Sequence, residues 1–179
     1  MKSIVLSVIG LTVSGVLLGV MPAFAQSEMM TDQHIARIKT NCEVARATLG
    51  QIHANDAPAY INRNQTYFSV SDKLMARLNS RLAFSRYNTT DLVKTASDYS
   101  DTLAKFRTAY KSYDDLMSDA VHTDCIREPV GFYDKVASVR DARQNVHDLA
   151  VQLTNLISQY HDQVQAFESK NFSSTGGKS

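Results

Sequence analysis

The sequence predicts an all-α protein: an elongated antiparallel three-helix bundle or coiled coil with up-down-up topology, after an N-terminal signal peptide. Its composition, 44% apolar and 21% charged, is that of a globular chain. Apolar residues recur at alternating steps of three and four, which is the spacing of a helical seam. The turns of a β-sandwich or an α/β domain would need more helix breakers than this chain has. Between positions 26 and 170 its only glycines and prolines are Gly50, Pro58, Pro129 and Gly131.

Residues 1–25 have the pattern of a secretory signal peptide. Lys2 gives the charged start, positions 4–20 form the apolar core, and Ala23-Phe24-Ala25 is a small-x-small cleavage site. A retained membrane anchor is the alternative, because an apolar run of about 17 residues is at the short limit for a span. The cleavage motif favours removal. We therefore expect a periplasmic or extracellular protein with one domain over residues 26–170 and a disordered tail over residues 171–179.

The two cysteines, Cys42 and Cys125, predict a structural disulfide. An exported protein meets an oxidising environment, and the pair lacks the C-x-x-C spacing of redox or haem-attachment motifs. Reflecting the second helix about a turn near residue 86 places the loop around Cys125 opposite residue 47, within about two turns of Cys42. The two sulfurs are therefore expected to meet at one end of the bundle.

The first helix is expected over residues 32–83, with Thr31 and Asp32 as its cap. Its seam breaks near Pro58, where we expect a kink or short break with Asp56 as a local cap. Before the break the seam consists of Ile35, Ile38, Cys42, Ala45, Leu49 and Ile52. Beyond it a shifted frame continues through Ile61, Phe68, Met75, Leu78 and Leu82.

The second and third helices have more regular seams, and short connections make them antiparallel neighbours. The second is expected over residues 90–122, after the capping run Asn88-Thr89-Thr90. The third is expected over residues 129–168, with Pro129 in its first turn. The second seam consists of Leu92, Ala96, Tyr99, Leu103, Phe106, Tyr110, Tyr113, Met117 and Ala120. The third consists of Phe132, Val136, Val139, Arg143, Val146, Ala150, Leu153, Ile157, Tyr160, Val164 and Phe167.

One seam position is charged, and it suggests a polar layer in the bundle. Extending the first seam by one step from Ile52 reaches Asp56, and helix alignment sets Arg143 beside position 57. His53 and His147 lie about one turn away. If the charges face inward they must pair, and loss of one partner would cost about 3–5 kcal/mol. The alternative is that both charges point to solvent, where the cost would be below ~1 kcal/mol.

Charge is unevenly distributed along the predicted rod. Residues 73–94 carry five basic side chains and one acidic side chain, whereas residues 111–135 carry six acidic and three basic ones. The first hairpin tip is thus expected to be positive and the opposite pole negative. A solvated face is the simpler interpretation; a contact surface is the functional one. The basic tip is formed by Lys73, Arg77, Arg81 and Arg86.

Several function classes are disfavoured by the sequence. A net charge of +1 argues against a nucleic-acid-coating protein. No histidine pair has the H-E-x-x-H spacing, and Glu-x-x-His repeats, P-loops and G-x-S-x-G motifs are absent. We therefore expect no catalytic residue, no metal and no cofactor.

A resemblance adds to this interpretation. It rests on Cys42, the His53-x-x-Asp56 step, the stretch from Lys73 to Ala83, Asp124-Cys125, Phe132-Tyr133 and Arg140-x-x-Arg143-x-x-x-His147. In these features the chain resembles uncharacterised exported helical proteins of ultra-small candidate-phyla bacteria. The resemblance spans most of the mature chain. It implies a bacterial envelope or extracellular helical protein with paired cysteines, and it implies no reaction.

The leading functional hypothesis is a non-enzymatic exported bundle that acts through surface contacts as an envelope-structural, adhesive or assembly component. Its partner would be an anionic polymer, a lipid surface, a protein or another copy of the chain. The alternative is a periplasmic chaperone-like or small-ligand-carrying bundle. That alternative needs an apolar groove or cavity, whereas the seams are expected to be filled by mutual packing.

Overall fold

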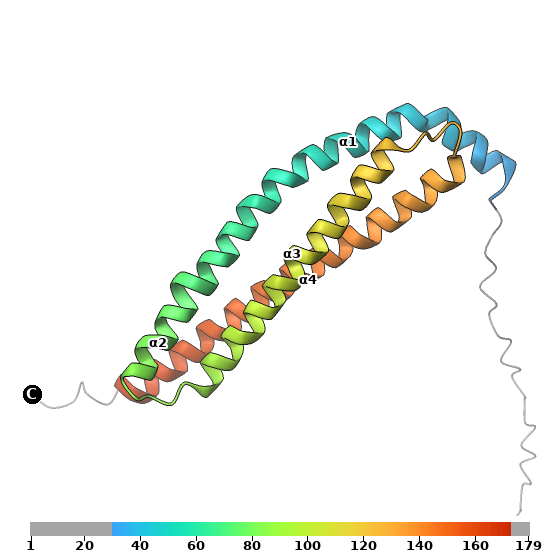
Figure 1. The fold of residues 1–179 in the computed structure, drawn as a ribbon. Helices are drawn as coiled ribbons and strands as arrows, with labels where there is room; N and C mark the ends of the chain where they lie inside the picture. Colours follow the sequence, from blue (N-terminus) through green and yellow to red (C-terminus); the bar gives the residue numbers. More distant parts are fainter. Residues whose placement is uncertain (1–29, 173–179) are drawn as a thin grey trace, which may run out of the picture.

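The computed structural model describes residues 30–172, which form an elongated bundle of three helical arms (Figure 1). The first arm comprises α1 (Asp32–Ser69), the π-helical turn η1 (Val70–Met75) and α2 (Ala76–Phe84). The second is α3 (Thr90–His122) and the third is α4 (Pro129–Phe172). The predicted all-α, up-down-up fold is confirmed. The predicted signal peptide, residues 1–25, lies outside the described residues.

The α3–α4 pair forms the main core. Tyr99, Phe106 and Tyr113 of α3 are almost completely buried, and Leu153 of α4 is as well. Every residue of the two predicted seams is buried or half-buried except Arg143. Because both seams keep one frame over their whole length, the two helices pack against each other over much of their length.

The predicted frame of the first arm is wrong between Pro58 and η1. Ile61 and Phe68, expected on the seam, are 53% and 48% exposed. Tyr60 and Tyr67 pack against the core instead. They continue the frame of the residues before Pro58. The frame changes only at η1, whose wider turn accommodates one extra residue and brings Met75 into the core.

The break expected near Pro58 does not occur. Helix α1 runs without interruption from Asp32 to Ser69 and bows away from the α3–α4 pair (Figure 1). Pro58 and Ala54 are both exposed, so the Ala54 carbonyl that loses its helical donor faces solvent, where water can satisfy it. Asp56 is not a cap; its side chain bonds to the other helices.

Both connections end their helices with recognisable turns. Beyond α2, Arg86 has a φ of 61°, while the Arg86 and Tyr87 amides donate to the carbonyls of Ala83 and Leu82. This is a Schellman motif with Arg86 at the position that glycine usually occupies. In the second connection, the Asp124 carboxylate accepts from the amides of Ile126 and Arg127. These amides lower the pKa of Asp124, that of Arg127 having the larger effect.

The C-terminal boundary extends past the predicted one. Helix α4 continues to Phe172, so residues 171 and 172, expected in the tail, are helical. The side-chain amide of Asn171 donates to the Phe167 carbonyl. Phe172 packs edge-on against Tyr87 and Phe167. This aromatic cluster explains the extra turn. Within residues 30–172, no helix is long and apolar enough to cross a membrane.

Candidate functional site

The disulfide joins α1 to the connection between α3 and α4. The Cα atoms of Cys42 and Cys125 are 5.6 Å apart, and the bond closes a sequence separation of 83 residues. Both cysteines are buried beside Phe132, with Ile38 and Val136 packed around them. The predicted pairing is thus present in the structure, and it fixes the N-terminal half of α1 at one end of the bundle.

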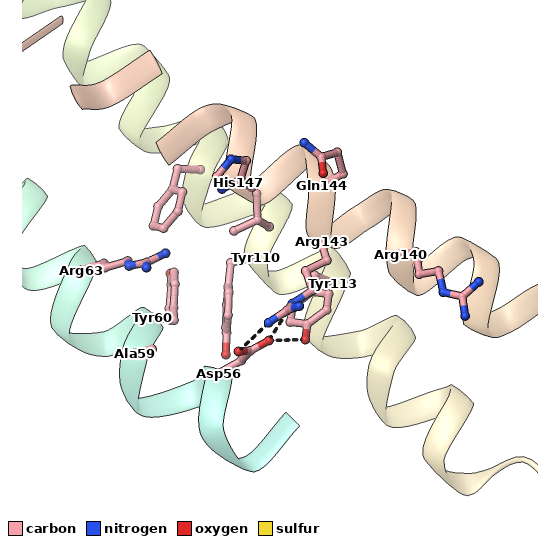
Figure 2. Close-up of a pocket in the computed structure, with 12 residues that line it drawn as sticks. Asp56, Ala59, Tyr60, Arg63, Tyr110, Tyr113, Arg140, Arg143, Gln144 and His147 are labelled. Atoms are coloured by element: carbon pink, nitrogen blue, oxygen red, sulfur yellow. Dashed lines mark hydrogen bonds and ion pairs between the residues drawn. The ribbon is translucent and has the colours of Figure 1, made fainter. Parts of the chain in front are cut away.

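A polar junction connects all three arms near the middle of the molecule. The Arg143 side chain donates from Nε and Nη2 to the Asp56 carboxylate, at 3.1 and 3.2 Å. The Tyr113 hydroxyl donates to the same carboxylate at 2.6 Å. Figure 2 shows the two donors converging on Asp56 from α4 and α3. One α1 carboxylate therefore binds both other helices.

The contacts at the junction raise the pKa values of Arg143 and Tyr113. The hydrogen bond to Asp56 is the main cause of a raised Arg143 pKa. Burial raises the pKa of Tyr113 most, and its hydrogen bond to Asp56 raises it further. Arg143 therefore stays cationic and Tyr113 stays a neutral donor. These are the protonation states that the three hydrogen bonds need.

The Asp56–Arg143 pair lies between the buried and the solvent-exposed alternatives that the sequence left open. The Arg143 side chain is 56% exposed and that of Asp56 is 24% exposed. The two charges pair, as expected for inward-facing groups, but the guanidinium retains contact with water. The cost of removing one partner should accordingly be near that of an exposed pair.

The two histidines expected in this layer lie outside its hydrogen bonds. The His53 imidazole bonds to Asp114 on α3, with Nε2 2.7 Å from Oδ1. His147 is exposed and lines a cavity beside the junction (Figure 2). Asp114 was absent from the predicted layer, because its position on α3 is not on the apolar seam.

A central cavity of about 560 Å³ opens beside the junction, between α1 and α4, with α3 as its floor. Tyr60 and Tyr110 stack in its wall, with ring centroids 3.5 Å apart. The Tyr110 hydroxyl is buried without a hydrogen-bond partner among the described residues, and burial is the main cause of its raised pKa. Arg63 and Arg140 also line this space.

The sequence prediction did not place Tyr60 and Arg63 on the inner face of the first helix, because it moved the apolar seam to a new frame at Pro58. Continuing the alternating steps of the earlier frame passes from Asp56 to Ala59 and Arg63, which both line the cavity next to Tyr60. The signal was therefore present in the spacing. The sequence analysis includes Arg140 in the Arg140-x-x-Arg143-x-x-x-His147 motif, one turn before Arg143, but does not predict a cavity there.

An apolar cavity lies on the disulfide side of the junction and has the same volume, about 560 Å³. Its wall includes Leu49 and Ile52 of α1, Met117 of α3, and Phe132 and Val139 of α4. Arg140 and Arg143 line both cavities. The expectation that the seams are filled by mutual packing is therefore wrong for the α1 side, because bowed α1 stands off from α4.

The basic tip has a different character from the opposite pole. Within residues 30–172, the exposed side chains of Lys73, Arg77, Arg81 and Arg86 make no ion pair or hydrogen bond. At the other pole most of the acidic groups are paired. Asp114, Asp115, Asp119 and Asp124 contact His53, Lys111, Lys135 and Arg127, respectively. The four cations of the basic tip thus have no partner among the described residues, whereas four carboxylates of the opposite pole have one.

Metal ligation has no obvious location in the described part of the chain. No group of three or more His, Cys, Asp or Glu side chains is placed to hold an ion there. Comparisons of the chain with protein-family models, curated proteins and solved structures find no match.

Proposed function

We propose that the chain is an exported, non-catalytic helical rod that acts by contact, docking its α2 end on the anionic lipid surface of the cell envelope. The observation that carries this proposal is Phe84, whose side chain is 92% exposed at the end of α2. An exposed apolar ring on the same arm as several unpaired cations is the chemistry of a membrane-interface contact. The cations are those of the basic tip: Lys73, Arg77, Arg81 and Arg86.

Arg86 strengthens the proposal through its backbone. A residue with a side chain costs about 1 kcal/mol more than glycine in the left-handed conformation. Arg86 occupies that conformation, with φ 61°, and its side chain forms no bond within residues 30–172 that would offset the cost. The Schellman hydrogen bonds of the Arg86 and Tyr87 amides hold this backbone conformation, so the Arg86 side chain is not needed for the turn. The guanidinium is therefore available for an outside partner.

Self-association through the acidic pole is the weaker alternative. Most of the carboxylates there already have cationic partners within the same chain. Docking a second copy would have to break or share those ion pairs. A lipid surface carries unpaired negative charge and requires no such exchange.

The proposal can be tested by co-sedimentation with lipid vesicles at low and high salt. Wild-type chain should bind vesicles containing phosphatidylglycerol and release them as salt rises. Replacing Arg77, Arg81 and Arg86 by Ser should weaken binding about 100-fold, because each cation near such a surface contributes about 1 kcal/mol. A matched control replaces Arg37, Lys39 and Lys105, three exposed cations away from this end, by Ser. Equal binding by both triple variants would contradict the proposal.

Three single variants separate the effect on membrane contact from the effect on folding. Arg86→Gly should raise the free energy of unfolding by about 1 kcal/mol, since it relieves the left-handed strain, and should still weaken vesicle binding. Phe84→Ser should weaken binding, whereas Val44→Ser, at an exposed position of α1 in the other half of the rod, should not.

A further inference from the structure

The two cavities adjoin along the α1–α4 interface, and we treat them as the two halves of one groove. They share Arg140 and Arg143 as lining residues, and the ion pair between Asp56 and Arg143 lies where they meet. On the disulfide side most of the wall is apolar, with Arg37, Asn41 and Thr48 of α1 also lining it. On the other side it is aromatic and cationic. The groove is therefore amphipathic along its length.

The apolar half has the lining of a binding site for a hydrocarbon chain. Its side chains come from all three arms: Ile38, Leu49, Ile52, Met117, Phe132 and Val139. Its volume falls in the range of small-molecule sites. Filling it with an apolar group would remove these side chains from water and would be favourable.

The charge at the junction is positive and incompletely paired. Asp56 is the sole acidic residue lining either cavity, and it is bonded to Arg143 and Tyr113. Arg140, one turn away on α4, makes no ion pair or hydrogen bond within residues 30–172. Figure 2 shows its side chain pointing away from Asp56. An unpaired guanidinium thus borders the inner end of the apolar half.

We propose that this groove binds a long-chain carboxylate, with the acyl chain in the apolar half and the carboxylate on Arg140. The planar guanidinium matches a carboxylate in two parallel hydrogen bonds. Arg37 and Arg63 also line the groove without an ion pair among the described residues, but each lines only one cavity. Arg140 is the unpaired cation that lines both, so the head group is assigned to it. Arg143 remains with Asp56, so binding leaves the helix-joining ion pair intact.

Isothermal titration calorimetry of the purified chain with laurate, dodecanol and butyrate tests the proposal. Laurate should bind saturably with one molecule per chain. Dodecanol, which has the chain without the charge, should bind about tenfold more weakly, a difference of about 1.4 kcal/mol. Butyrate, which has the charge without the chain, should show no binding. Equal affinities for laurate and dodecanol would overturn the carboxylate assignment.

Arg140→Gln and Ala45→Phe test the two halves separately. Arg140→Gln should weaken laurate binding about tenfold and leave dodecanol binding unchanged, while Lys105→Gln, an exposed cation on α3 outside the groove, should change neither. Ala45→Phe places a ring in the apolar half and should weaken both ligands. Wild-type affinity for laurate in Arg140→Gln would overturn the proposal, as would the absence of laurate binding by the wild-type chain.

The oligomeric state of the chain shows whether a second copy, and not a ligand, occupies the groove. A second copy of the chain could cover the groove instead of a ligand. Light scattering should show that wild-type chain has the same mass with and without laurate. A wild-type dimer that Ala45→Phe or laurate dissociates would assign the groove to a second copy and overturn the proposal. Circular dichroism of each variant shows whether its helices are intact.

Discussion

The interface between α3 and α4 and the attachment of α1 to that pair use different chemistry. Helices α3 and α4 meet through continuous rows of buried apolar and aromatic side chains, among them Phe106, Tyr113 and Leu153. Helix α1 has one buried residue, Cys42. It is connected through the disulfide, through half-buried side chains such as Leu49, Tyr60 and Tyr67, and through polar contacts that reach across to the other helices.

The polar contacts are distributed along the whole first arm. Arg46 donates to the Val121 carbonyl at 3.0 Å near the disulfide, and Asp56 accepts from α3 and α4 at the centre. Nearer the basic tip, Arg107 donates to Asn64 at 2.7 Å. Tyr99 and Tyr160 donate to groups on the first arm close to η1. Such contacts fix position without requiring close apolar packing, so the groove beside α4 can remain open.

Removing the disulfide should have the largest effect on this arrangement. For a loop of 83 residues, the chain-entropy model gives a loss of about 4.5 kcal/mol. The double variant Cys42→Ser/Cys125→Ser should lose this much in urea unfolding. Hydrogen exchange should accelerate mainly in residues 35–52 of α1, since few other bonds hold that part. Uniform acceleration over all helices, or a loss below about 1 kcal/mol, would contradict the comparison.

Truncating the apolar core should have the next largest effect. Leu153 has no exposed surface and packs in the α3–α4 core. Leu153→Ala should lower the free energy of unfolding by about 3 kcal/mol, within the usual range for buried leucines. Leu49→Ala on α1, where the side chain is half-buried and borders the groove, is the matched control and should lose less than half as much. Urea unfolding followed by circular dichroism measures both. Equal losses would show that α1 packs as tightly as the other two helices.

The same difference explains which parts of the fold could be predicted. In α3 and α4 every seam residue except Arg143 is buried or half-buried, so the apolar spacing predicted both helices and the faces through which they meet. In the first arm, Ile61 and Phe68 are more apolar than Tyr60 and Tyr67, yet the tyrosines face the core. Tyr67 stays inside because it accepts a hydrogen bond from Tyr99 through its carbonyl and packs edge-on against Phe106. Hydrophobicity alone does not contain that information.

The candidate sites were predictable to different degrees. Helix register brought Asp56 near Arg143, and cysteine count with chain reversal brought Cys42 near Cys125. The groove was not predictable, because periodicity indicates which face of a helix is apolar but not how far that face lies from its neighbour. The wider turn at η1 also has no strong sequence signature; only the change of frame between Tyr67 and Met75 indicates it.

The smallest of these effects is expected at the Asp56–Arg143 pair, and it tests the attachment of α1 most directly. A double-mutant cycle with Asp56→Asn and Arg143→Gln should give a coupling energy of about 1 kcal/mol, because the Arg143 side chain is 56% exposed and water weakens the attraction. Tyr113→Phe keeps the ring in the core while it removes a donor to the same carboxylate. A second cycle between positions 56 and 113 should give a similar value, since that hydrogen bond is charge-assisted but lies beside a half-open junction.

The two cycles together show whether α1 is held by separate, partly exposed polar bonds or by a desolvated pair in close packing. Coupling of about 1 kcal/mol in each would mean that one carboxylate holds α1 to both neighbours through modest, separate bonds. A coupling of about 3–5 kcal/mol between positions 56 and 143 would mean that the pair is desolvated in solution and that α1 packs more closely than the structure places it. No measurable coupling would return both charges to the solvated surface and leave the disulfide, with the remaining polar contacts, to hold the first arm.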